Sequence, residues 1–268
     1  GALGASNADG ARLLAFAVAF FMAYKPVREL AEARIARARA GIAMERLAAG
    51  VDEDAGESES EGESAGEGVV EMRRVVLRRA KIGAIDLTIA AGKIVVLRGP
   101  TGVGKTTLLR TLLGFLAPRS GTIRTAARAF AWVPQDAPIV RGTLAENVGL
   151  GGDCDVRAAM ETIGAGALYD RLGDAQLGVG GRAVSGGEAK QIAIARALAT
   201  NKPVLLLDEP TSGLDDRAQA AVLAAIERLR GKRTVLLVTH RPEPIAIADE
   251  VIDLTAQSAE RAEAPGES

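Results

Sequence analysis

The segment that most constrains this chain covers residues 99–107 and reads Gly-Pro-Thr-Gly-Val-Gly-Lys-Thr-Thr. It fits the phosphate-binding pattern G-x-x-x-x-G-K-[ST], whose defining positions are here Gly99, Gly104, Lys105 and Thr106. An apolar run at residues 94–97 precedes it, and a helical pattern follows at 108–113. This is the strand–loop–helix context that the pattern requires, so we expect a loop that binds phosphate.

The residue types in this loop offer three kinds of phosphate contact. Glycines let the backbone curl so that several N–H groups point at one phosphate, and the helix N-terminus adds partial positive charge. A lysine can reach the β- and γ-phosphates, and the Thr106 hydroxyl can bind Mg²⁺. The expected nucleotide-binding residues are Gly99, Pro100, Thr101, Gly102, Val103, Gly104, Lys105, Thr106 and Thr107.

A second polar group follows an apolar strand pattern at residues 204–207. The strand ends in Asp208 and Glu209, two adjacent carboxylates. The strand tip is expected to place Asp208 beside the phosphate loop, where it can hold Mg²⁺ directly or through water. Glu209 then faces the γ-phosphate side and can orient or deprotonate an attacking water.

Composition excludes several classes of partner and setting. The net charge is −1 and aromatic residues make up 3% of the chain, so neither a basic field nor a base-stacking surface predicts nucleic-acid binding. The single cysteine, Cys154, excludes an intrachain disulfide and fits a reduced, cytosolic setting. Hydrophobic residues at 48% and charged residues at 25% are typical of a globular protein.

Residues 1–50 differ from the rest of the chain. Residues 13–24 form an uncharged apolar run, shorter than the roughly 20 residues that span a bilayer. A signal-peptide core, a buried helix and the end of a transmembrane helix are the alternatives. Five basic residues follow the run between positions 25 and 39, whereas residues 1–11 contain no Lys or Arg. This asymmetry favours the third alternative with its C-terminal side cytoplasmic. We expect a partial transmembrane helix with a cytoplasmic extension.

The remaining chain divides into three parts. Residues 51–68 are acidic and rich in Gly and Ser, which predicts a disordered linker, and residues 257–268 form a polar tail expected to be disordered. Residues 69–256 alternate strand and helix patterns, which predicts an α/β fold. Antiparallel strands are expected at 69–77 and 85–89, mostly parallel strands at 94–97, 130–133, 204–207, 235–238 and 251–254, and helices at 188–200 and 217–230.

Several motifs in this domain resemble those of ATP-binding cassette (ABC) proteins, in the family's order. Residues 184–188, Val-Ser-Gly-Gly-Glu, resemble the family's signature motif. Gln135 resembles the glutamine loop, residues 212–215 resemble the loop that contacts the partner subunit, and His240 resembles the switch histidine. The resemblance implies a P-loop NTPase core with a mostly parallel sheet, an antiparallel β layer and a helical subdomain, preceded here by a long N-terminal helix.

The same resemblance implies an ATPase that works as a head-to-tail dimer, either a homodimer or a heterodimer. The cofactors would be ATP and Mg²⁺. The implied catalytic residues are Glu209, His240, Gln135 and Lys105, and the implied metal ligands are Thr106, Gln135 and Asp208. A second copy would complete each nucleotide site with Ser185, Gly186, Gly187 and Asp215.

Residues 134–148 resemble the exporter version of the cassette, and residues 9–50 resemble an exporter's final transmembrane helix and its extension. The implied protein acts at the cytoplasmic face of the inner membrane, with transmembrane helices as partners. Two departures from the exporter pattern matter. Arg78 or Arg79 stands where an adenine-stacking aromatic residue is usual, and residues 176–181 lack the usual acidic residues. Five further membrane helices are also missing from this sequence.

Two other functions are compatible with the sequence. A soluble ABC ATPase could use ATP as a dimerisation switch, although this sequence has no coiled-coil insertion, second cassette or basic patch. The chain could also be a truncated fragment whose cassette folds without coupling to transport.

Overall fold

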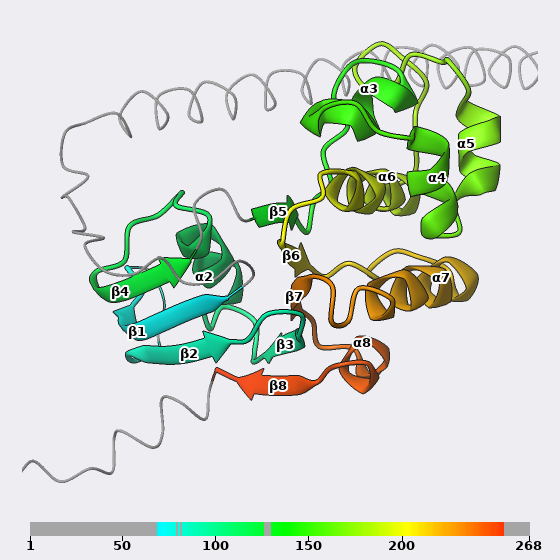
Figure 1. Cartoon of the computed structure of the whole chain (residues 1–268). Coiled ribbons are helices and arrows are strands. Elements are labelled where there is room, and N and C mark those ends of the chain that lie inside the picture. Colours follow the sequence, from blue (N-terminus) through cyan, green and yellow to red (C-terminus); the bar gives the residue numbers. More distant parts are fainter. Residues whose placement is uncertain (1–68, 79, 81, 126–129, 255–268) are drawn as a thin grey trace, which may run out of the picture. The chain divides into compact units, whose positions relative to one another are not determined.

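The structure is a computed structural model that describes residues 69–78, 80, 82–125 and 130–254 (Figure 1). All of them belong to one of the two units into which the chain divides, and this unit is described by itself. The predicted membrane helix and extension, acidic linker and C-terminal tail lie outside the described residues, at 1–50, 51–68 and 257–268. None of the described helices has the length and apolar character needed to cross a bilayer.

Five strands form a sheet in the order β5-β6-β7-β3-β8, and every neighbouring pair is parallel. All residues of β6 and β7 are buried, because both faces of the sheet are covered. The predicted parallel strands are confirmed within one residue at either end. Their bounds are β3 (Ile94–Arg98), β5 (Phe130–Val133), β6 (Val204–Asp208), β7 (Thr234–Val238) and β8 (Glu250–Asp253).

A second, three-stranded sheet is antiparallel, with the order β2-β1-β4. It contains β1 (Val70–Val76), β2 (Ile85–Ile89) and β4 (Ser120–Thr125). Buried and exposed residues alternate along β2, as expected for a sheet with one face on the core. The sequence patterns did not predict β4, because none of its residues is fully buried and no apolar alternation marks it.

The helices follow the alternation expected of an α/β fold. In chain order they are α2 (Lys105–Leu112), α3 (Leu144–Val148), the 3₁₀ helix η1 (Gly149–Gly151), α4 (Val156–Thr162), α5 (Gly166–Leu172), α6 (Gly186–Ala199), α7 (Asp216–Glu227) and α8 (Pro242–Ala246). Figure 1 shows α3, α4 and α5 gathered around α6, between β5 and β6 in the chain. This group corresponds to the predicted helical subdomain.

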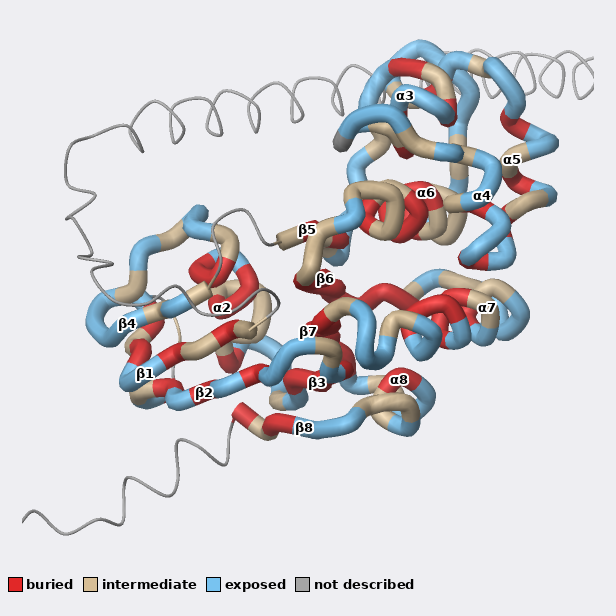
Figure 2. The backbone as a smooth tube through the Cα atoms, in the orientation of Figure 1, coloured by how far each residue is buried: buried red, intermediate tan, exposed pale blue. Residues whose placement is uncertain are grey.

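Two hydrophobic clusters lie on opposite faces of the parallel sheet. Alternate residues of β6 belong to different clusters: Leu205 and Leu207 join one, and Val204 and Leu206 join the other. The first cluster includes residues of α4, α5, α6 and α7, and the second includes residues of α2, β1 and β2. Figure 2 shows the buried residues running through β6 and β7. The parallel sheet is therefore the middle layer of the domain.

Candidate functional site

The loop between β3 and α2 depends on its glycines. Gly102 and Gly104 have φ angles of 82° and 122°, a region that residues with a side chain rarely adopt. A Cβ added at Gly104 would also lie 2.6 Å from the Cβ of Ala80. The loop therefore curls as predicted and lies close to the segment that follows β1.

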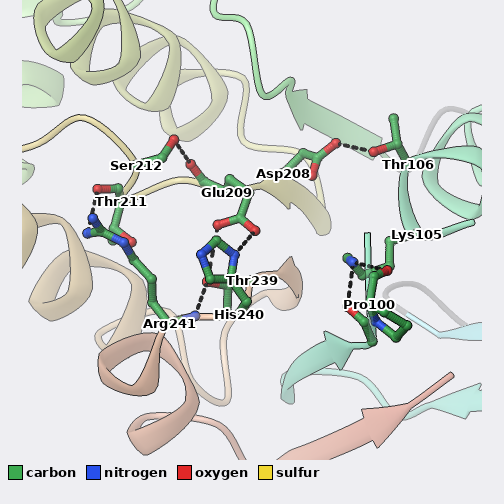
Figure 3. A network of polar contacts seen from close by, with 11 residues as sticks. Pro100, Lys105, Thr106, Asp208, Glu209, Thr211, Ser212, Thr239, His240 and Arg241 are labelled. Atoms are coloured by element: carbon green, nitrogen blue, oxygen red, sulfur yellow. Dashed lines mark hydrogen bonds and ion pairs between the residues drawn. The ribbon is translucent and has the colours of Figure 1, made fainter. Parts of the chain in front are cut away.

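Helix α2 begins at Lys105 with its first amides free of side-chain caps. Gly104 has no side chain to accept from them, and the first turn contains no acidic residue. The Nζ of Lys105 donates to the carbonyl oxygens of Gly99 at 2.6 Å and Pro100 at 3.0 Å, so the ammonium lies against the loop (Figure 3). Unpaired amides, helix dipole and ammonium together make an anion-binding site.

Asp208, the last residue of β6, lies beside the first turn of α2. It is 2% exposed, and its Oδ2 accepts a hydrogen bond of 2.9 Å from the Thr106 hydroxyl. Burial raises the pKa of this carboxyl group, although the Thr106 hydrogen bond acts in the opposite direction. The structure thus brings together two of the three predicted metal ligands.

This pKa shift predicts a stability penalty at Asp208. The raised pKa means that the folded state favours the protonated form, so ionised Asp208 destabilises the fold. The penalty is absent below the ordinary pKa of aspartate and grows as the pH rises through the raised value. Without nucleotide and in chelator, Asp208→Asn should therefore raise the Tm at pH 8. About 1 kcal/mol corresponds to about 2–4 °C for a domain of this size.

Thermal melts from pH 4 to pH 8 would measure the effect, with the gain shrinking toward acid. Asp153→Asn, in an exposed loop, is the matched control. A lower Tm for Asp208→Asn at pH 8 would mean that the Thr106 hydrogen bond outweighs burial.

Glu209 and His240 meet at the ends of adjacent strands. The Nδ1–H of His240 donates to Glu209 Oε1 at 2.8 Å, and the hydroxyl of Thr239 lies 3.4 Å from Glu209 Oε2 (Figure 3). Glu209 is 9% exposed, whereas the His240 side chain is 78% exposed. Glu209 also has a φ of 49°, a left-handed conformation that is unfavourable for a residue with a side chain. The pair therefore places a nearly buried carboxylate beside an accessible imidazole.

A further group of contacts, which sequence patterns did not reveal, holds this pair in place. Arg241 donates to the carbonyl oxygen of Thr211 at 3.2 Å (Figure 3). It also donates to Gln219 Oε1 at 2.6 Å. Its backbone amide donates to the Thr239 hydroxyl at 3.1 Å. The guanidinium therefore ties the segment after β7 to the segment after β6 and to α7.

Gln135 lies two residues beyond the end of β5. Because β5 pairs in parallel with β6, with Val133 opposite Leu207, the Gln135 segment follows the strand neighbouring Asp208. Its side chain is exposed, and its carbonyl accepts a hydrogen bond from Lys190 of α6. Sequence patterns did not predict a role for Lys190. Its helical spacing nevertheless places it on the same buried side of α6 as Ala193, three residues later.

The predicted partner-contact residues have local roles within one copy. Ser185 caps α6 in a reciprocal pair with Glu188, and Asp215 caps α7 by accepting from the amide of Ala218. Gly186 begins α6 and is exposed. A Cβ at Gly187 would lie 2.7 Å from the carbonyl oxygen of Gly213, so the motif lies against the 212–215 loop. These contacts explain local structure and leave the role toward a second copy as a prediction.

The two departures from the exporter pattern differ in how far the structure describes and exposes them. Arg78 is exposed near the phosphate loop, and Arg79 lies outside the described residues. In the segment 176–181, Val179 is 88% exposed, while Leu177 is buried and bridges to Gly142 and Arg182. Base stacking on an arginine therefore remains a prediction.

The phosphate loop follows β3, the two carboxylates stand at the end of β6, and the histidine follows β7, the strand between these two. This arrangement defines the class of P-loop nucleoside triphosphatases. Residues 82–212 match the family model described as ABC transporter. The described domain belongs to the ABC transporter family, and the predicted resemblance and fold class are confirmed.

The relatives are named as ATP-dependent flippases and as an export protein. The ATP-dependent lipid A-core flippase of Burkholderia orbicola is 34% identical over 91% of this chain and 45% of its own length. The flippase of the same name from Ralstonia nicotianae is 38% identical over 66% of this chain and 33% of its own length. The β-(1→2)glucan export ATP-binding/permease protein NdvA of Agrobacterium vitis is 35% identical over 70% of this chain and 36% of its own. The chain thus spans less than half the length of these relatives.

A solved structure shows the same fold. A bacterial Atm1-family ABC exporter with ATP bound matches with a TM-score of 0.65 and 29% sequence identity. The match covers 74% of this chain and 41% of that chain.

Proposed function

We propose that this chain is the ATP-hydrolysing part of an ABC exporter at the cytoplasmic face of a membrane. Residues 1–50 would supply the end of a transmembrane helix and its extension. The alignment with the Burkholderia flippase supports this assignment, because it covers 91% of the chain and so must extend before residue 69. Transport itself would need membrane helices beyond those in this sequence.

One observation carries the proposal for ATP hydrolysis. The strands β6, β7 and β3 are neighbours in the parallel sheet, and each ends in a different part of the site. Asp208 ends β6 and Glu209 follows it, His240 follows β7, and the phosphate loop follows β3. Since ligands of open α/β sheets bind at the carboxyl ends of the strands, a nucleotide bound there would meet all three groups.

The donor groups of this site fit Mg²⁺. The Thr106 hydroxyl and Asp208 carboxylate are adjacent oxygen ligands, the type that Mg²⁺ prefers. The described residues contain no group of three or more His, Cys, Asp or Glu side chains able to hold a metal. Mg²⁺ commonly uses one or two protein ligands together with substrate phosphates and waters. When bound, the ion would neutralise charge on the phosphates.

The residues have distinct proposed roles in hydrolysis. Lys105 and the amides of the loop hold the phosphates, and Glu209 orients a water and accepts its proton. The water oxygen bonds to the γ-phosphorus as the bond to the bridging oxygen breaks, which yields ADP and phosphate. The exposed imidazole of His240 contacts the γ-phosphate, and positioning with charge stabilisation supplies most of the rate enhancement.

Completion of each site would require a second copy. Ser185 and Gly186 are exposed at the N-terminus of α6, a helix of 14 residues that can present free amides and a dipole to a phosphate. In a head-to-tail dimer, each copy would then contribute its phosphate loop to one site and Ser185 to the other.

Mixing two inactive variants would test this shared-site arrangement. Lys105→Ala removes the phosphate-binding lysine, and Ser185→Arg blocks the exposed end of α6. Each alone should lack ATP turnover. A 1:1 mixture should recover about a quarter of the parent activity, because half of the dimers are mixed and each holds one intact site. Phosphate release would be measured at several protein concentrations.

A mixture that stays inactive, from two variants with the parent's circular dichroism, would contradict shared sites. Each variant mixed with itself at the same total concentration provides the control. Turnover by Ser185→Arg alone would show that the partner serine is dispensable.

A further inference from the structure

Lys190 is a lysine of α6 whose side chain is buried in the fold. It lies in the second turn of α6 and is only 3% exposed. Removing an ammonium group from water costs several kcal/mol unless hydrogen bonds and opposite charges compensate. The cost of burying this ammonium therefore depends on the groups that its charge contacts.

Two carbonyl oxygens of a distant segment accept hydrogen bonds from the Lys190 ammonium. Its Nζ donates to the carbonyl of Pro134 at 3.2 Å and, at shorter distance, to the carbonyl of Gln135. Both acceptors lie just beyond β5, more than 50 positions earlier in the chain. Hydrogen bonds from a charged donor are the stronger kind, so they fix the path of the Gln135 backbone relative to α6.

Two of the three carboxylates near Lys190 belong to the candidate site. Burial lowers the pKa of the ammonium, while the carboxylates of Asp208, Asp136 and Glu209 favour its charged form. The ammonium therefore binds the backbone carbonyl of Gln135 and is within electrostatic range of the carboxylates at the end of β6.

We infer that Lys190 is a positioning residue for the nucleotide site, holding Gln135 in register with Asp208 and Glu209. The inference rests on the proposed function. Because Ser185 caps the same helix five residues earlier, a displacement of α6 at this end would move Gln135 with it. Lys190 therefore connects the end of α6 that faces a second copy to the copy's own nucleotide.

Two substitutions separate positioning from general stability. Lys190→Met keeps the length of the side chain but removes the charge and all donors, and such a replacement of a buried charge is often neutral or stabilising. Lys190→Gln keeps an N–H group that can donate to a carbonyl. Lys232→Met, in the exposed turn before β7, controls for the loss of one positive charge.

The full chain with Mg-ATP provides the main readout. Lys190→Met should lower kcat about tenfold, the loss expected when a hydrogen bond to a charged group is removed. ATP affinity should stay within about threefold, because Lys105 and the loop are unchanged. Lys190→Gln should recover to within about threefold of the parent. Adding Lys190→Met to Gln135→Ala should lower kcat further by less than about twofold, since both act through one group.

Acrylamide quenching of Trp132 provides a readout that does not depend on turnover. Trp132 is the chain's only tryptophan and lies in β5, three residues before Gln135. Quenching should increase in Lys190→Met and remain at the parent level in Lys190→Gln and Lys232→Met.

Unchanged kcat and unchanged quenching in Lys190→Met would overturn the inference, as would effects of Lys190→Met and Gln135→Ala that multiply. A parent chain without turnover would instead contradict the proposed function. In that case the quenching comparison still decides whether Lys190 holds the Gln135 segment.

Discussion

Replacing Glu209 with glutamine should lower ATP turnover at least about 100-fold while leaving ATP bound, as the loss of a general base predicts. The amide has the shape of the carboxylate and can still bond to His240 and Thr239, so the segment after β6 should keep its conformation. It cannot accept a proton from water at neutral pH. Single-turnover phosphate release and equilibrium ATP binding would measure the two properties separately.

The same variant should accumulate as a dimer in Mg-ATP, because hydrolysis is what would release two copies clamped around the nucleotide. Size-exclusion chromatography with and without Mg-ATP would detect it. Glu250→Gln, an exposed residue of β8, is the matched control and should retain parent turnover. Near-parent turnover in Glu209→Gln would exclude Glu209 as the base.

Replacing Lys105 with alanine should abolish both binding and turnover. The ammonium already lies against the carbonyls of Gly99 and Pro100, at the start of the helix whose amides face the loop. Removing a charged donor to phosphate should weaken ATP binding at least about tenfold. Turnover should fall to the background rate, because the same charge stabilises the transition state.

Binding of a fluorescent ATP analogue and phosphate release would test this expectation. Lys93→Ala, at the opposite end of β3, removes an exposed lysine by the same change and should bind ATP normally. ATP affinity in Lys105→Ala equal to that of the parent would place the phosphates somewhere other than this loop.

Sequence patterns predicted the elements whose burial is uniform. The strands β6 and β7 read as unbroken apolar runs because both faces of the sheet are covered. By contrast, β4 depends on pairing with β1 and has no apolar pattern of its own. The short helices α3, α4 and α5 were predicted only through the family resemblance, because helices of five to seven residues give little periodicity.

Residues of the site were likewise predictable only where a local sequence pattern marks them. Motif spacing predicted roles for Lys105, Asp208 and Glu209, because each of these residues belongs to a short motif of neighbouring positions. It could not identify Lys190 or Arg241, whose partners are backbone carbonyls of segments distant in the chain. A carbonyl is common to every residue, so no sequence pattern marks it as an acceptor. The roles of Ser185 and Asp215 toward a second copy remain predictions.

The backbone at Glu209 and the side chain at Glu209 favour different amino acids. A φ of 49° suits glycine or asparagine and disfavours glutamate by about 1–2 kcal/mol. Aspartate would tolerate the conformation better, but its shorter side chain would retreat from the imidazole. Directed evolution for heat resistance would therefore be drawn to glycine or asparagine here, and the hardier protein would have lost its proposed water-activating group.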